Sequence, residues 1–203
     1  AFQKLVLPKS WAITYIEWIE HIEGETLVAY CIRLSQQVNT SAPFSLVGLS
    51  FGGIVAVELA KIIQPVYTIL ISSVSTSKEL PISYASRSFI RKLHLQKLIP
   101  ATVFSHVNSF TYWLFGTKTT AEKELLKAII TDTPPHFAKW AFGEIITWEN
   151  TQKTSCLFHI HGTEDRLFPY KKVVADVKVN GGGHFMVFSH AAIISKLLIE
   201  KIS

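Results

Sequence analysis

In the first part of the chain, stretches of alternating apolar residues give way to stretches with helical spacing. Residues 12–18 alternate and are rich in aromatics, which predicts a strand. Residues 66–72 form a continuous apolar, β-branched run, which is the pattern of a parallel strand buried on both faces. Residues 54–63 are apolar nearly all round, as expected of a helix between a sheet and its cover. The predicted elements of this part are strands at 12–18, 44–49 and 66–72 and helices at 25–38 and 54–63.

The alternation of strand and helix stops in the middle of the chain. The predicted helices there are at 86–98, 101–115, 120–131 and 135–149, and no strand is predicted among them. Strands at 154–162 and 175–179 and a closing helix at 189–202 follow. Alternating strands and helices imply an α/β fold with a mostly parallel sheet and helices on both faces. We therefore divide the chain into a first core segment at 1–76, an all-helical insertion at 77–153 and a second core segment at 154–203.

The pentapeptide Gly48-Leu49-Ser50-Phe51-Gly52 stands where a predicted strand passes into a predicted helix. A GxSxG sequence in this context is typical of a nucleophile elbow, a strained turn that lifts the serine Oγ above the sheet edge. We expect Gly48 and Gly52 to supply the space for this turn. The alternative is an ordinary tight turn. Ser50 is the candidate nucleophile.

A serine hydroxyl needs a base to take its proton and an acid to orient that base. Asp165 lies at the end of the returning strand, in the run His161-Gly162-Thr163-Glu164-Asp165. His184 follows three glycines, after one more predicted strand. Two alternatives stay open at this point, because Glu164 beside Asp165 is a possible acid and His184 a possible cap of the last helix.

From Trp11 onward the chain resembles the α/β-hydrolase fold family, on the elbow, the HGxxDxxxP strand end and the GGGH loop in that order. The resemblance implies that Ser50 is the nucleophile, Asp165 the acid and His184 the general base. It also implies that the helical insertion forms a cap over the active site. Aromatic cap residues would then line an apolar pocket, with Trp113 and Trp140 as the expected substrate-binding residues, although such spacing is also common in a plain core. The aromatic residues of the insertion that we expect to line the pocket are Phe104, Phe110, Tyr112, Trp113, Phe115, Trp140, Phe142 and Trp148.

The oxyanion of an acyl-transfer intermediate needs two donors. The Phe51 N–H, which follows the nucleophile, is the first. In the family the second comes from a loop well upstream of the elbow, and no matching His-Gly or Pro-Gly sequence is present here. We therefore expect a strand and an oxyanion loop, about twenty or more residues, to precede Ala1 in the complete protein. The alternative is that Phe2 or Leu5 supplies the donor.

Several other polar residues are interpreted as structural. His159 and His161 lie two apart in a predicted strand and so share one face. Glu58 is expected to be a buried hydrogen-bond partner on the elbow helix. His94 and His106 are expected at the surface of the insertion.

Composition narrows the class of protein. Of 203 residues, 48% are hydrophobic, yet no run of about 20 apolar residues suited to a bilayer is present, nor a signal peptide. Cys31 and Cys156 are expected to be free buried thiols, which favours a reducing, cytoplasmic setting. The net charge of +5 comes without a nucleic-acid-binding motif, so no nucleic-acid partner is expected. The basic helix at 86–98 is interpreted as packing on the core, with contact to an anionic lipid surface as the alternative.

Together these features predict a serine hydrolase that cleaves carboxylic esters of a small hydrophobic substrate, without a cofactor or metal. Thioesters, lysophospholipids and the carbon–carbon bonds of diketones are alternative substrates, because the same fold and triad serve them. Dehalogenase and epoxide hydrolase chemistry is disfavoured, since related enzymes carry Asp at the position of Ser50. A hydrolase-like module that binds a hydrophobic molecule without catalysis is the second hypothesis. The oligomeric state is left open.

Overall fold

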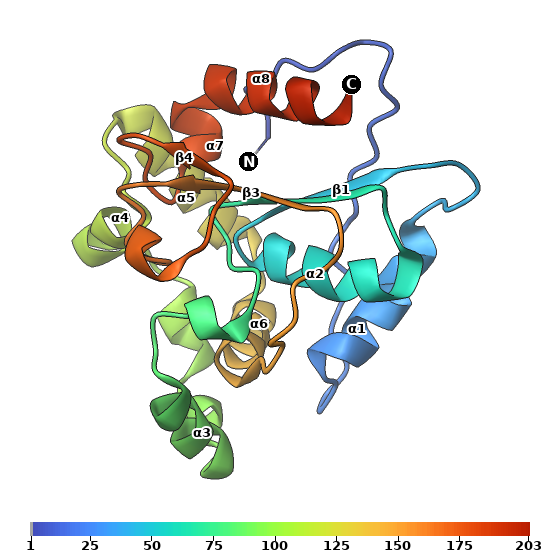
Figure 1. The fold of residues 1–203 in the computed structure, drawn as a ribbon. Coiled ribbons are helices and arrows are strands. Elements are labelled where there is room, and N and C mark those ends of the chain that lie inside the picture. The colour runs from blue at the N-terminus through green and yellow to red at the C-terminus, as the bar shows by residue number, and fades with distance from the viewer. Residues whose placement is uncertain (1) are drawn as a thin grey trace.

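The computed structural model describes residues 2–203, and its centre is a four-stranded parallel sheet (Figure 1). The strands are β1 (Ser45–Leu49), β2 (Tyr67–Ile71), β3 (Leu157–Gly162) and β4 (Val177–Val179), in the order β1-β2-β3-β4. All three neighbouring pairs are parallel. The carboxyl ends of the strands therefore lie at one edge of the sheet, where ligands bind in open α/β folds.

Helices cover both faces of the sheet (Figure 1). On one side lie α1 (Leu27–Leu34), α2 (Phe51–Ile63) and α6 (Pro135–Thr147), and on the other α7 (Met186–Ser189) and α8 (Ala191–Ile202). Leu70 belongs to the core cluster with α1 and α2, whereas Ile69 and Ile71 belong to the cluster with α8. Strand β2 is thus buried on both faces, as its sequence predicted.

Between β2 and β3 the described residues form helices and no strand. The α-helices are α3 (Tyr84–Lys92), α4 (Ser109–Phe115), α5 (Thr120–Asp132) and α6, and the short 3-10 turns are η2 (Ser77–Glu79), η3 (Leu95–Leu98) and η4 (Ala101–Phe104). Two predicted helices are each broken in two. His94 takes a left-handed φ of 52° after α3, and Asn108 starts α4 afresh by accepting from the Thr111 N–H at 2.9 Å. The remaining 3-10 turns are η1 (Ser35–Gln37) and η5 (Tyr170–Lys172).

The predicted strand at 12–18 is wrong, because these residues pair with no strand of the described chain. An alternating pattern specifies a strand only where a neighbour takes its backbone hydrogen bonds. Here the chain runs past the sheet as coil, and Ile13 and Tyr15 stay exposed.

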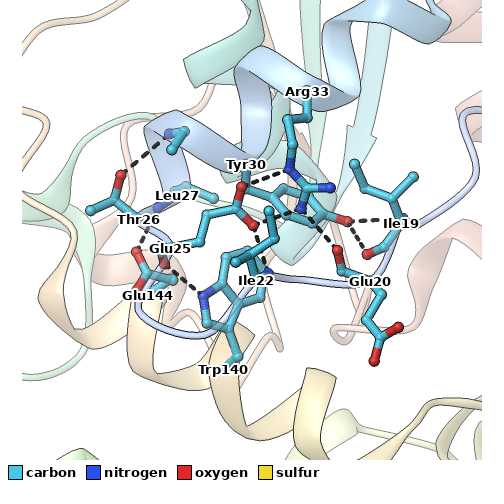
Figure 2. A network of polar contacts seen from close by, with 11 residues as sticks. Ile19, Glu20, Ile22, Glu25, Thr26, Leu27, Tyr30, Arg33, Trp140 and Glu144 are labelled. Carbon is cyan, nitrogen blue, oxygen red and sulfur yellow. Dashed lines mark hydrogen bonds and ion pairs between the residues drawn. The ribbon is translucent and has the colours of Figure 1, made fainter.

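Polar contacts fix the residues that follow this coil (Figure 2). The Glu25 carboxylate accepts from Arg33 Nε and Nη2, both at 2.7 Å, and this pairing lowers the pKa of Glu25. The Tyr30 hydroxyl donates to the Ile19 carbonyl at 3.0 Å. Residues 19–25 are therefore bound to the side of α1.

The same segment is bound to α6 (Figure 2). Trp140 Nε1 donates to the Glu25 carbonyl at 3.0 Å, and Glu144 Oε2 accepts from the Leu27 N–H at 2.8 Å. This arrangement holds Trp18 near the elbow, where its ring stacks on Phe51 at 5.7 Å between centroids.

The two cysteines differ in their surroundings. Cys31 is a buried free thiol, as expected, and burial raises its pKa to about 12. The expectation of burial is wrong for Cys156, which is free but exposed. It precedes β3 with a left-handed φ of 54°, outside the pleated run whose side chains are buried.

No helix among residues 2–203 is both long and apolar enough to cross a membrane.

Candidate active site

Ser50 occupies the turn between β1 and α2 with φ 54° and ψ −123°, a backbone conformation that costs a non-glycine residue free energy. Hydrogen bonds on both sides hold it there. The Ser50 N–H donates to the Ile71 carbonyl at 3.1 Å, and Ser73 Oγ donates to the Ser50 carbonyl at 2.7 Å. The neighbouring strand β2 and the loop after it therefore fix the strained serine.

The glycines around Ser50 contribute unequally. A Cβ on Gly48 would lie 2.3 Å from the Gly52 carbonyl oxygen, and one on Gly53 would lie 2.3 Å from Ser73 Oγ. A Cβ on Gly52 would meet nothing closer than the Trp18 ring at 3.9 Å. The sequence expectation is thus correct for Gly48 but misplaced for Gly52, since Gly53 is the second position that excludes a side chain.

Three side chains from distant parts of the chain meet at this edge of the sheet. His184 Nδ1 lies 2.9 Å from Asp165 Oδ2, and His184 Nε2 lies 2.8 Å from Ser50 Oγ. Asp165 and His184 are buried, and Ser50 is partly exposed. Because a carboxylate only accepts, Nδ1 carries the proton of a neutral His184, and Nε2 is left to accept from the Ser50 hydroxyl. This is the hydrogen-bond order of a nucleophile, a base and an orienting acid.

Asp165 is held as a carboxylate. Burial alone would raise its pKa, but His184 and the Phe168 N–H stabilise the charged form and hold the pKa below its usual value. Asp165 Oδ1 accepts from the backbone N–H groups of Leu167 and Phe168, both at 2.9 Å. Glu164, the alternative acid, is exposed and pairs with Lys118 at 2.8 Å, so the structure brings Asp165 and not Glu164 to His184.

Phe51 is the first residue of α2, so its N–H has no acceptor within the helix. It follows Ser50 directly and is the candidate oxyanion donor that the sequence indicates. The Leu5 N–H donates to the Phe2 carbonyl at 3.0 Å, and both side chains pack with the α8 cluster. The second oxyanion donor that the resemblance implies stays a prediction.

Two phenyl rings flank His184. The Phe115 ring, from the end of cap helix α4, stands edge-on to the imidazole at 5.3 Å between centroids. The Phe168 ring, from the acid loop, lies at 5.6 Å. Sequence alone gives Phe115 no priority among the eight aromatic residues expected to line the pocket. Its one distinguishing signal is the following Gly116, which ends α4 with a φ of 69°.

The two expected substrate-binding tryptophans lie in different places. Trp140 packs its ring against Phe51 at 6.1 Å between centroids, beside the elbow. Trp113 is 53% exposed, stacks on Phe110 and lies under the Arg166 guanidinium. The structure therefore brings Trp140 toward Ser50 and leaves Trp113 on the outer side of α4.

Other residues singled out in the sequence are structural. Glu58 is buried and accepts from Trp148 Nε1 at 2.7 Å, while His94 and His106 are exposed, as expected. No cluster of three His, Cys, Asp or Glu suited to a metal ion occurs among residues 2–203. A surface hollow of about 500 Å³ is lined by Val6 and residues of α8, and Ser50 does not line it.

Comparison with known proteins agrees with this architecture. A family model described as "Alpha/beta hydrolase family" matches residues 11–196, and the chain belongs to this family. No curated protein matches the sequence significantly.

Similar solved structures include a thermophilic esterase from Thermogutta terrifontis, with TM-score 0.60, 16% identity and coverage of 96% of this chain and 75% of that one. MenH from S. aureus has TM-score 0.67 and 13% identity, with coverage of 91% and 78%. A bromoperoxidase from Bacillus anthracis has TM-score 0.58 and 16% identity, with coverage of 98% and 79%. At these identities the likeness shows the shared fold alone.

Proposed function

We propose that this chain is a serine hydrolase that cleaves carboxylic esters through an acyl enzyme on Ser50. The observation that carries the proposal is the continuous hydrogen-bonded order Ser50, His184, Asp165, with contacts of 2.8 and 2.9 Å. Asp165 is buried and held in its ionised form, whereas Ser50 at the other end of the series is accessible. This arrangement suits nucleophilic catalysis.

The reaction follows from the positions of these groups. Ser50 Oγ attacks the ester carbonyl while His184 Nε2 takes its proton, and Asp165 stabilises the imidazolium that forms. The Phe51 N–H donates to the developing oxyanion. His184 then returns the proton to the leaving alcohol, which leaves an acyl group on Ser50. Water, deprotonated by His184, attacks the acyl group and releases the carboxylic acid.

The surroundings of the triad favour an apolar acyl or aryl group. Phe115 and Phe168 contact His184, and Trp140 contacts Phe51. We place Trp140 on the inner wall of the substrate site and Trp113 at its outer rim. The esterase among the structural neighbours is compatible with ester substrates, but thioesters, lysophospholipids and diketones use the same triad in this fold.

A fluorophosphonate probe tests the proposal, because it reacts with an activated serine regardless of the natural substrate. We expect one equivalent to attach at Ser50 and none in Ser50→Ala. Replacement of an exposed serine, Ser86→Ala, is the matched control and should leave labelling unchanged. Absence of labelling in the folded wild-type protein would contradict the proposal and favour a noncatalytic binding module. A series of p-nitrophenyl esters of increasing acyl length then defines the acyl preference.

A further inference from the structure

A second histidine approaches the acid of the triad. His161 Nε2 lies 3.5 Å from Asp165 Oδ2, the oxygen that also accepts from His184 Nδ1. The same nitrogen lies 2.8 Å from the carbonyl oxygen of Phe168. His161 is fully buried, so these contacts are shielded from water. The sequence alone gives this residue only a structural role.

The hydrogen bonds fix which nitrogen of His161 carries a proton. The Phe168 carbonyl only accepts, so His161 Nε2 must be protonated. In the neutral ring, Nδ1 is then an acceptor, and it lies 3.3 Å from His159 Nε2, which must donate. Burial and the proximity of His161 lower the pKa of His159 to about 3, and burial lowers that of His161 against the attraction of Asp165. Both rings are therefore neutral at physiological pH.

The sheet holds both imidazoles in place. His159 and His161 are alternate residues of β3, whose Ile160 points into the α8 cluster on the other face. The His159 N–H donates to Asp176 Oδ2 at 2.7 Å, and the Asp176 N–H donates back to the His159 carbonyl. Side chains on a paired strand are held more rigidly than those on a loop.

Phe168 links His161 to the rest of the site. Its carbonyl accepts from His161, its N–H donates to Asp165 Oδ1, and its ring contacts His184. Asp165 Oδ1 accepts from two backbone N–H groups and Oδ2 accepts from His184 Nδ1, while His161 Nε2 lies 3.5 Å from Oδ2.

We propose that His161 is a positioning residue of the triad, which orients Asp165 directly and through Phe168, and that His159 fixes its tautomer. This inference rests on the proposed function of Ser50, Asp165 and His184. The Nε2–H of His161 donates to the Phe168 carbonyl, and the positive end of this N–H dipole lies close enough to Asp165 Oδ2, at 3.5 Å between heavy atoms, to stabilise its negative charge. It thereby moderates the attraction of the carboxylate for the proton of His184 and restricts rotation of the carboxylate away from it.

Two variants separate this role from simple packing. His161→Gln keeps an amide N–H near the position of Nε2, whereas His161→Leu removes the donor. We expect His161→Leu to lower kcat about 10-fold with little change in KM, the loss of one hydrogen bond in a preorganised site. The acid limb of the pH profile of kcat/KM should move to higher pH, because Asp165 then holds the proton on His184 more strongly. His161→Gln should restore most of kcat and the wild-type profile.

Each kcat is calculated per active site, with the active sites counted by fluorophosphonate titration. Misfolded protein therefore does not lower the kcat of a variant. If the wild type does not label at all, the proposed function fails. If it labels and His161→Leu retains the wild-type kcat and pH profile, the positioning role fails. Nitrogen-15 NMR of histidine in the wild-type protein gives an independent readout, with Nε2–H expected on His161. An Nδ1–H tautomer on His161 would overturn the proposal even in a fully active enzyme.

Discussion

Gly116 and Gly183 meet backbone to backbone, since a Cβ placed on Gly116 would lie 3.3 Å from the Gly183 Cα. Gly116 ends cap helix α4, and Gly183 immediately precedes His184. Nearby, Lys118 Nζ contacts Glu164 and the Arg166 guanidinium donates to the Trp113 carbonyl at 2.6 Å. The cap therefore buttresses the loops that carry His184 and Asp165.

Replacing Gly116 by Ala should displace the histidine loop. The new Cβ adds left-handed strain, about 1–2 kcal/mol, to the close contact with Gly183. Gly24→Ala is the matched control, because Gly24 has a φ of 77° but open space around it. We expect both variants to lower the free energy of unfolding in urea, and only Gly116→Ala to slow fluorophosphonate labelling of Ser50. Equal labelling rates would contradict the buttressing role.

The elbow glycines should respond differently to the same change. Gly48→Ala places a methyl group against the Gly52 carbonyl and should cost more than about 3 kcal/mol of unfolding free energy. Gly52 lies in the first turn of α2 with room for a Cβ, so Gly52→Ala should change stability by less than about 1 kcal/mol. Chemical unfolding of the two variants measures the difference. A well-folded Gly48→Ala protein would show that the elbow tolerates a wider turn.

Asp165→Asn should remove most of the activity without unfolding the protein. An amide facing His184 Nδ1 favours the wrong tautomer, and in a serine protease the equivalent change lowers kcat about 10⁴-fold. Glu164→Gln is the matched control one residue away, where the side chain pairs with Lys118 at the surface. Steady-state ester hydrolysis of both variants distinguishes them. A large loss in Glu164→Gln with activity retained in Asp165→Asn would reverse the assignment.

Phe115 should matter more to catalysis than Trp113. Phe115→Ala removes the phenyl ring of the cap that contacts His184. We expect kcat/KM for apolar esters to fall about 10-fold. Trp113→Ala removes a half-exposed ring at the proposed rim and should change kcat/KM by less than about threefold. Kinetics with short and long acyl esters measure both effects. The opposite ranking would move the substrate site to the outer side of α4.

The free energy of unfolding should decrease as the pH is lowered, and the titration of His159 should cause part of this decrease. The unfolded residue titrates near pH 6.5, whereas burial and the proximity of His161, with a smaller effect of Lys153, lower the folded pKa to about 3. The unfolded state then binds a proton that the native state does not, so stability is complete above pH 6.5 and is lost as the pH falls toward 3. For one such group, linkage gives a loss of about 2 kcal/mol between pH 8 and pH 5.

His159→Gln keeps a donor toward His161 but does not titrate, so it should remove about this much of the difference between urea unfolding at the two pH values. His94→Gln provides the reference for replacing an exposed histidine. An unchanged pH dependence in His159→Gln would show that His159 is not buried in its neutral form.

Sequence patterns located the regular elements where local and global requirements agree. The mostly apolar run at 66–72 contains β2, which is buried on both faces. The GxSxG motif correctly places Ser50 between β1 and α2. The strand predicted at 12–18 failed because alternation describes a side-chain pattern, while a strand also needs a partner for its backbone.

The meeting of Ser50, Asp165 and His184 was predictable because each of them stands at a turn with its own glycine or strand-end signature. Phe115 and His161 were not predictable as parts of the site. Phe115 is one of many aromatic residues at helical spacing, and its contact with His184 depends on how α4 docks. His161 was recognised as structural from its place in β3, but its distance from Asp165 depends on the path of the loop from Gly162 to Phe168.

The separation of Ser50 and His184 by 134 residues has a consequence for biosynthesis. The turn at Ser50 leaves the ribosome long before the loop that carries His184, and in the order of synthesis Asp165 and then His184 come last of the three. With His184 as the proposed base, Ser50 stays unreactive until the part of the chain that carries His184 has docked. In a refolding experiment, the time at which Ser50 becomes reactive would mark the completion of the longest-range contacts rather than the formation of its own turn.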